Sequence, residues 1–184
     1  MIESDQAETP KALWDMLDRK YVFGRDLAAS SRNAKCMAHF TLEDSALKHR
    51  WTMQLVDGQP VKYQLWDWCN PPYSRGNLDA FTAKAREEVA MGWAGVLLIP
   101  ATPGAQWFQR HVLHGHDVLS GESVNPASES LLQGWELRLG GNGYQLRVRF
   151  LMRRVKFFNP FRPDVKDGAK TDSCLIEYRP RRLL

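Results

Sequence analysis

The sequence lacks any apolar run of about 18 residues, the length needed to cross a bilayer. Its first residues, Met1 to Gln6, have neither the basic nor the apolar region of a signal peptide. It has only three cysteines, Cys36, Cys69 and Cys174, far apart and with no CxxC pair, which excludes a disulfide framework and a zinc site. We therefore expect a cytoplasmic protein with reduced thiols, no membrane segment and no bound metal.

The chain does contain a large apolar fraction. Its 184 residues are 43% hydrophobic and 11% aromatic, which is enough for one domain with a substantial core. We expect residues 1–184 to form a single domain that is a monomer or a weak dimer.

The net charge of +4 conceals an uneven distribution. Residues 144–184 have a balance of +7, which leaves −3 for residues 1–143. This asymmetry fits a polyanion contacted by the C-terminal quarter, and a solvated face with basic strand ends explains it equally well. If nucleic acid is the partner, the candidates for phosphate contacts are Arg75, Arg153, Arg154 and Lys156.

Hydrophobic spacing predicts alternating helices and strands over the first two thirds of the chain. The expected elements are a helix from Pro10 to about Lys20 with Thr9 as its N-cap, strands at Tyr21–Ala29, Trp51–Val56 and Val61–Cys69, a helix at Asn77–Met91, a buried strand at Gly95–Pro100 and a helix at Pro103–Leu113. This order implies parallel crossovers, whose ligands bind at the carboxyl ends of the strands. Asp26 and Asn70 would both lie on that edge.

The last third of the sequence changes character. Strands are expected at Trp135–Leu139, Tyr144–Phe150, Val155–Phe158 and Cys174–Tyr178, with a hairpin turn at Gly140–Gly143. The segment after Gly115, rich in Ser, Gly and Asn, is typical of a mobile insertion loop, placed at about 115–143. The predicted fold class is α/β, with a mostly parallel sheet and a β-hairpin-rich C-terminal part.

The tetrapeptide Asn70-Pro71-Pro72-Tyr73 is the most informative motif. The N6 amine of adenine is a poor nucleophile because its lone pair is delocalised into the ring. The Asn70 amide oxygen and the Pro71 carbonyl oxygen could each accept one N6 hydrogen, which stabilises the attacking amine more than the resting one. The proline pair stiffens the turn, and Tyr73 offers a flat face for a base swung out of the duplex.

Other interpretations of these residues remain open. The tetrapeptide also suits a proline-rich turn that closes a strand, with Tyr73 in the core. Asp26 and Asp44 could be surface acids. His111, His114 and His116 have no carboxylate or thiol at ligand spacing and indicate an exposed helix end rather than a metal site.

Nine segments in a fixed order carry a resemblance to a known family. They are Thr9-Pro10, Arg25–Ser30, Asn33–Cys36, Phe40–Leu47, Trp68–Ser74, Leu97–Ala101, Trp107-Phe108, Arg154–Pro160 and Thr171–Ile176. Together they resemble the bacteriophage-type DNA N6-adenine methyltransferases that carry an NPPY motif. The resemblance covers most of the chain outside roughly 115 to 143.

The resemblance implies a Rossmann-like methyltransferase fold that uses S-adenosylmethionine, with Asn70, Pro71, Pro72 and Tyr73 as the catalytic motif. The cofactor-binding residues that it implies are Thr9, Pro10, Asp26, Ala28, Ala29, Ser30 and Asp44. Asp26 and the turn after it match the segment that lies against the methionine part, and Asp44 matches the adenosine end. Unlike the loop of most methyltransferases, this turn has no glycine.

The function that follows is transfer of a methyl group from S-adenosylmethionine to N6 of a flipped adenine in DNA, by a phage- or prophage-encoded protein in a bacterial host cell. Two alternatives stay open. One is a catalytically inactive nucleic-acid-binding module on the same fold, and the other is an N-methyltransferase that acts on RNA or on protein glutamine.

Overall fold

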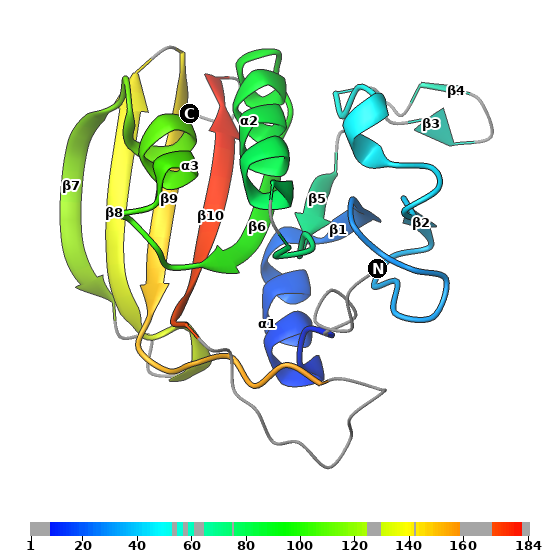
Figure 1. Cartoon of the computed structure of the whole chain (residues 1–184), viewed down its shortest axis with the longest axis horizontal. Helices are drawn as coiled ribbons and strands as arrows, with labels where there is room; N and C mark the ends of the chain where they lie inside the picture. The colour runs from blue at the N-terminus through cyan, green and yellow to red at the C-terminus, as the bar shows by residue number, and fades with distance from the viewer. Residues whose placement is uncertain are drawn as a thin grey trace.

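One eight-stranded sheet organises the chain, in the strand order β2-β1-β5-β6-β10-β9-β8-β7 (Figure 1). This is a computed structural model, and it describes residues 8–52, 55–56, 59–60, 65–74, 76–124, 130–141, 143–158 and 171–181. The first half of the sheet consists of β1 (Phe23–Asp26), β2 (Ala38–His39), β5 (Trp66–Cys69) and β6 (Gly95–Pro100). The second half consists of β7 (Asp117–Val124), β8 (Gly134–Gly141), β9 (Tyr144–Leu151) and β10 (Ser173–Pro180). The strands β3 (Leu55–Val56) and β4 (Gln59–Pro60) form a separate ribbon.

The α/β class is confirmed, but the expectation of a mostly parallel sheet is wrong. Three strand pairings are parallel, all among β2, β1, β5 and β6. The other four pairings, from β6 through β10, β9 and β8 to β7, are antiparallel. The physical reason is that β8 and β9 follow each other too closely for a crossover, and such short connections join antiparallel strands.

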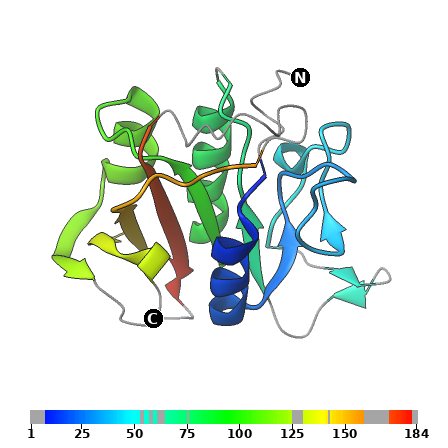
Figure 2. The ribbon, with the colours of Figure 1, turned by 90° about the horizontal axis from the view of Figure 1, so that it is seen from below.

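Helices cover the two faces of the sheet, as the view from below shows (Figure 2). On one face, α1 (Lys11–Tyr21) packs Leu13 and Leu17 in an apolar cluster with Trp68, Val96 and Leu98 of the strands. On the other face, α2 (Asn77–Ala90) buries its apolar side in a second cluster that includes residues of β6, β9 and β10. The shorter helical segments are η2 (Ala46–Lys48), α3 (Gln106–Phe108), η3 (Gln109–Leu113) and η4 (Ser130–Leu132).

The predicted insertion loop at about 115–143 is wrong where the structure describes it. Most of this segment forms β7 and β8, which pair with each other from Asp117–Gly140 to Val124–Gly134. Within the described residues, β7 pairs with no strand other than β8 and lies at the edge of the sheet. Its side chains are largely exposed, so backbone hydrogen bonds hold the strand without an apolar pattern in the sequence.

Several element ends also differ from the prediction. Tyr21 is the last residue of α1 rather than the first residue of a strand, because Val22 adopts a left-handed conformation with φ 54° and ends the helix. Trp51 and Thr52 do not extend β3. Their N–H groups instead donate to the Glu88 carboxylate of α2, over 3.0 and 3.3 Å.

Two further predicted elements are shorter than expected. The helix at Pro103–Leu113 is a single turn, α3, followed by the π-helical turn η3. The predicted strand at Val155–Phe158 makes one isolated bridge, from Phe158 to Glu8. The start of the strand predicted at Val61–Cys69, residues 61–64, lies outside the described residues.

The longest helix of the described segments is α2, and none of the described helices is long and apolar enough to cross a membrane.

A buried charge network joins β1 to β5. The Arg25 guanidinium donates from Nη2 to Oδ2 of Asp67 over 2.5 Å and to the carbonyl oxygen of Trp51 over 2.6 Å. The indole N–H of Trp93 donates to the same Asp67 oxygen over 2.7 Å. Asp67 is fully buried, so these donors replace the water that its carboxylate has lost.

We predict that Asp67→Ala lowers the free energy of unfolding by about 3–5 kcal/mol, because it leaves the buried Arg25 charge without its carboxylate. Urea denaturation followed by circular dichroism measures this change. The matched control is Asp15→Ala, which removes an exposed i,i+4 pair with Lys11 and should cost about 0.5 kcal/mol or less. Equal losses in the two variants would contradict a structural role for the buried network.

Candidate active site

The carboxyl ends of two neighbouring parallel strands bring the predicted motifs together. Asp26 is the last residue of β1, and it pairs with Trp68 of β5. The N–H of Leu27 continues this pairing by donating to the carbonyl oxygen of Trp68 over 2.9 Å. Asn70 follows β5 directly. The prediction that Asp26 and Asn70 lie on the same edge of the sheet is therefore confirmed.

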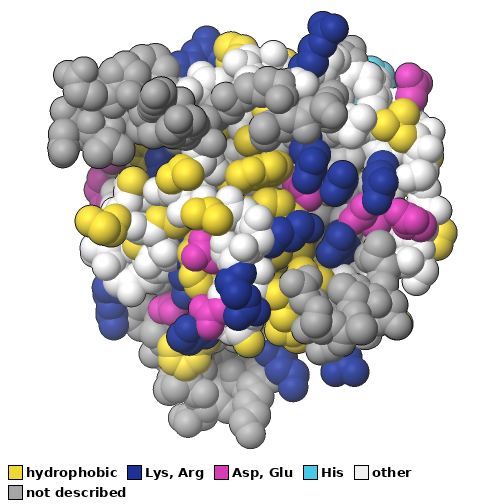
Figure 3. All heavy atoms as spheres, turned by 180° about the vertical axis from the view of Figure 1, so that it is seen from behind, with side chains coloured by type: hydrophobic (Ala, Val, Ile, Leu, Met, Phe, Trp, Pro, Cys, Tyr) yellow, Lys and Arg dark blue, Asp and Glu magenta, His cyan; other side chains and the backbone are white. Residues whose placement is uncertain are grey.

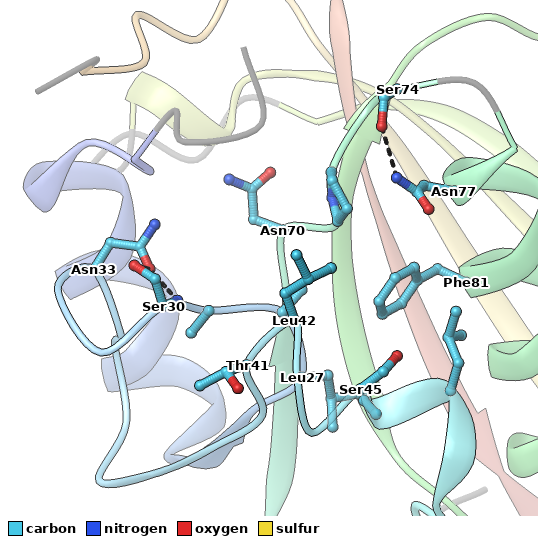
Figure 4. Close-up of a pocket in the computed structure, with 15 residues that line it drawn as sticks. Leu27, Ser30, Asn33, Thr41, Leu42, Ser45, Asn70, Ser74, Asn77 and Phe81 are labelled. Carbon is cyan, nitrogen blue, oxygen red and sulfur yellow. Dashed lines mark hydrogen bonds between the residues drawn. The ribbon is translucent and has the colours of Figure 1, made fainter. Parts of the chain in front are cut away.

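A cavity of about 350 Å³ opens at this edge (Figure 4). Fifteen residues line it, and none of them has a charged side chain. They are Leu27, Ala28, Ala29, Ser30, Asn33, Thr41, Leu42, Ser45, Ala46, Leu47, Asn70, Pro72, Ser74, Asn77 and Phe81. The turn after β1, the 41–47 segment, the NPPY motif and the start of α2 thus surround one neutral space.

The turn after β1 is organised by the Asp26 carboxylate. Its Oδ1 accepts from the N–H of Ala28 over 3.2 Å, and its Oδ2 accepts from the N–H of Lys35 over 3.1 Å. Burial raises the pKa of the Asp26 carboxyl, and these two donors oppose the rise. The Asp26 side chain thereby closes a loop that contains no glycine.

The side chains of the NPPY motif hold one another in place. The Tyr73 hydroxyl lies 2.9 Å from Oδ1 of Asn70 and 3.0 Å from the carbonyl oxygen of Leu98, so its single proton has two acceptors. Burial raises the pKa of Tyr73 well above its usual value, which keeps the phenol protonated as a donor. Pro71 is buried, whereas Pro72 lines the cavity.

A second, much smaller cavity of about 20 Å³ adjoins the first. It shares Ala28, Asn33 and Asn70 with the large cavity, and its remaining wall consists of Glu8, Thr9, Asp26, Lys35 and Trp68. Thr9 and Asp26, two predicted cofactor residues, therefore lie beside the main cavity rather than in its wall.

Two predicted cofactor residues lie elsewhere. Asp44 is exposed, does not line either cavity, and forms an ion pair with His49 over 2.7 Å. Pro10 is the residue before the first turn of α1, so the helix begins one residue later than the sequence suggests. Thr9, the residue before Pro10, lines the small cavity, whereas Pro10 lines neither cavity.

A segment that follows β9, residues 152–158, crosses the carboxyl edge of the sheet toward the start of α1 (Figures 1 and 2). We call it the strap. Its Phe157 ring packs edge-to-face against Tyr73 with 6.1 Å between ring centroids. Phe158 is bonded to Glu8 by two backbone hydrogen bonds, of 2.7 and 3.1 Å. The strap therefore contacts both the NPPY motif and the wall of the small cavity.

The strap holds three of the four predicted phosphate contacts. Arg153, Arg154 and Lys156 are all exposed, and Arg154 pairs with Asp172 over 3.2 Å. Arg75 lies outside the described residues.

Arg147, Arg149 and Arg179 belong to a different surface, the face of the sheet beside α1. Figure 3 shows Lys and Arg side chains alternating there with Asp and Glu side chains. Arg138 and Arg149 both pair with Glu136, and Arg179 pairs with Glu177. Part of the excess positive charge of residues 144–184 is thus neutralised by carboxylates within the sheet. On the strap, Arg154 pairs with Asp172, whereas Arg153 and Lys156 form no ion pair among the described residues.

Sequence reasoning gave no role to several residues that line the main cavity, above all Asn33, Thr41, Ser45 and Asn77. The first three lie in segments that carry the family resemblance, and this resemblance could have indicated them as cavity residues. Nothing in the sequence indicated Asn77, because its position depends on where α2 begins relative to the NPPY motif.

No group of three His, Cys, Asp or Glu side chains suited to a metal ion occurs in the part of the chain that the structure describes.

Comparisons with known proteins identify related sequences. The sequence model of the DNA N-6-adenine-methyltransferase (Dam) family matches residues 2–122. The DNA N-6-adenine-methyltransferase of Escherichia phage T1 is 31% identical over 105 residues, which are 56% of this chain and 39% of the phage protein. A protein of Escherichia coli (strain K12) named "Putative methyltransferase YfdM" is 36% identical over 70 residues, 38% of this chain and 71% of that protein.

The match to the phage T1 enzyme thus spans well under half of its length. The family match nevertheless includes the turn after β1, the 41–47 segment and the whole NPPY motif. Because it covers about two thirds of the sequence and every wall of the main cavity, the chain belongs to the DNA N-6-adenine-methyltransferase family.

Proposed function

We propose that this protein transfers a methyl group from S-adenosylmethionine to N6 of an adenine in DNA. The observation that carries the proposal is that Asn70 and Pro72 of the NPPY motif line the same cavity as Ala28, Ala29 and Ser30 of the predicted cofactor turn. A donor and an acceptor bound in one space can be held at reacting distance, which is a large part of catalysis in group transfer.

The cavity fits the proposed cofactor in size and character. About 350 Å³ lies within the usual range for small-molecule sites. Leu27, Leu42 and Phe81 offer apolar surface for a planar base, and Ser30 and Thr41 offer hydroxyls for a sugar. The parallel half of the sheet would then be the Rossmann-like, cofactor-binding half, with its ligand at the carboxyl ends of β1 and β5.

When bound, S-adenosylmethionine would supply the methyl group. The N6 lone pair would form the new carbon–nitrogen bond while the methyl carbon's bond to sulfur breaks. The electrons of the broken bond pass to sulfur, and the surplus N6 proton passes to water. The protein's part is to hold the amine. Oδ1 of Asn70 and the carbonyl oxygen of Pro71 accept the two N6 hydrogens and so stabilise the positive charge that develops on nitrogen. An amide oxygen has two lone pairs, so the contact with Tyr73 is compatible with this role.

The target base must leave the duplex to reach Asn70. Tyr73 and Phe157 pack together at this edge, and we propose them as the aromatic surface on which the extruded base stacks. The exposed cations of the strap lie on the same segment as Phe157, so phosphates beside the target would meet Arg153, Arg154 and Lys156. We propose a phage- or prophage-encoded enzyme that acts on DNA in the bacterial cytoplasm.

We predict that Asn70→Ala lowers the rate of methyl transfer by about 100- to 1000-fold, because one preorganised acceptor is lost. The assay follows N6-methyladenine in a DNA duplex, with RNA and protein substrates as separate arms. Asn70→Asp keeps oxygen acceptors at the same place and should retain more activity than Asn70→Ala.

Binding of DNA by Asn70→Ala should stay within a few-fold of the wild type. Full activity in this variant would refute the role of Asn70. Methylation of RNA or protein in preference to DNA would replace the substrate, and tight DNA binding with no donor binding by the wild type would indicate an inactive nucleic-acid-binding module.

We predict that Arg153→Ala together with Lys156→Ala weakens DNA binding equally for different sequences. The slope of log affinity against log salt should fall by about 0.9 for each phosphate contact that is lost. Arg19→Ala is the control, because Arg19 is exposed in the last turn of α1, at the opposite end of that helix from the strap. An unchanged slope in the double variant would show that the strap does not contact phosphates.

A further inference from the structure

The strap exposes an aromatic ring beside the NPPY motif. Two of the large apolar side chains exposed in the described part of the chain are aromatic, Trp135 and Phe158, and each is 50% exposed. Trp135 lies on β8, in the outer half of the sheet, where its ring packs over Gly121 of β7. Phe158 lies at the carboxyl edge instead, next in sequence to the ring that packs against Tyr73. Of these two rings, Phe158 is thus the one placed to contact a substrate at the site.

Burial alternates along this part of the strap. Val155 is buried and Phe157 is half-buried, and both pack in the apolar cluster beside α1. Arg154, Lys156 and Phe158 are exposed. Successive side chains of an extended chain point to opposite sides, so these three share the outer side of the strap. The outer side therefore has two cations and one aromatic ring, the groups that contact phosphates and bases in nucleic acids.

Hydrogen bonds fix both ends of the strap. At the end near β9, the N–H of Met152 donates to the carbonyl oxygen of Gln133 over 2.9 Å. At the other end, Glu8 and Phe158 each donate an N–H to the other's carbonyl oxygen, over 2.7 and 3.1 Å. The backbone that carries the Phe158 ring is thus ordered in the free protein, which reduces the cost of ordering it on binding.

Two neighbours place Phe158 next to the proposed reaction. Glu8, with which it forms the bridge, lines the small cavity together with Asn70. Phe157, which precedes it, packs against Tyr73. Figure 2 shows the strap, in orange, on the near side of the sheet. A duplex whose target base reaches Asn70 across this edge would therefore meet the outer side of the strap.

An adenine that leaves the duplex leaves a gap in the base stack, and the unstacking has an energetic cost. Apolar side chains such as Phe, Leu and Met lower this cost when they insert between bases. We propose that Phe158 inserts into the gap left by the target adenine, while Arg154 and Lys156 contact the phosphates beside it. The inference rests on the proposed function, since it takes methylation of an extruded adenine as the reaction. It assigns Phe158 the role of keeping the target base outside the stack.

The test compares two duplexes that contain the sequence methylated by the wild type, as identified by sequencing methylated DNA. The target adenine is paired with thymine in one duplex and faces an abasic site in the other, where extrusion costs less. At limiting DNA, Phe158→Ala should methylate the paired duplex about 10- to 100-fold more slowly than the wild type does, because the stacking ring is lost. It should methylate the abasic duplex within about threefold of the wild type. Phe158→Trp keeps a stacking ring and should retain most of the activity on the paired duplex.

The matched control is Met152→Ala, which removes an apolar side chain that is 74% exposed at the other end of the strap and should leave both rates unchanged. Phe158→Ala removes no charge, so the slope of log affinity against log salt should stay that of the wild type. Retained activity on the abasic duplex also shows that this variant is folded.

Equal slowing of Phe158→Ala on both duplexes would show that the ring only supports the strap. Unchanged rates on both would show that the ring stays outside the duplex. Either result overturns the inference and leaves the proposed function standing. If the wild type methylates no DNA, the proposed function fails, and this inference fails with it.

Discussion

The register between β1 and β5 is the constraint on which the site depends. These parallel strands pair Arg25 with Asp67 and Asp26 with Trp68. A slip of one residue would turn each side chain to the opposite face of the sheet, and would remove the buried Arg25 guanidinium from the Asp67 carboxylate. The cost of separating those charges in the interior fixes the alignment. Because of it, the turn after Asp26 and the NPPY motif after Cys69 emerge side by side.

The absence of glycine from the turn after β1 has a structural explanation. A glycine-rich loop lets backbone approach a ligand because it has no Cβ atoms, whereas here the small side chains of Ala28, Ala29 and Ser30 line the cavity. The loop is held by the Asp26 carboxylate, which accepts N–H groups at both ends of it. The Asp26 side chain therefore fixes the shape of this loop by hydrogen bonds. Asp26 does not line the main cavity itself, but it positions the loop residues that do.

The sequence predicted the elements whose burial pattern is strong and missed those whose position depends on tertiary contacts. The apolar run Gly95–Pro100 and the helix from Asn77 were predicted closely, because β6 is buried along its whole length and α2 has one apolar face. The edge strand β7 was missed because its side chains are exposed and only its backbone is paired. The same limit applies to the site. The positions of Asp26 and Asn70 were predicted from the ends of their strands, whereas Asp44 is exposed and pairs with His49, which no spacing predicts.

The C-terminal third of the chain lies outside the family match, yet it packs against the elements that form the site. The match ends at residue 122, whereas β6 is flanked on one side by β10, whose pairing runs from Ser173–Pro100 to Tyr178–Gly95. Without β10, β6 would become an exposed apolar edge, and α2 would lose the cover of Ile176 and Tyr178 in its core. The strap adds Phe157 against Tyr73 and fixes Glu8 through Phe158. Residues 2–122 therefore contain the walls of the main cavity, while the later strands and the strap determine how those walls are held.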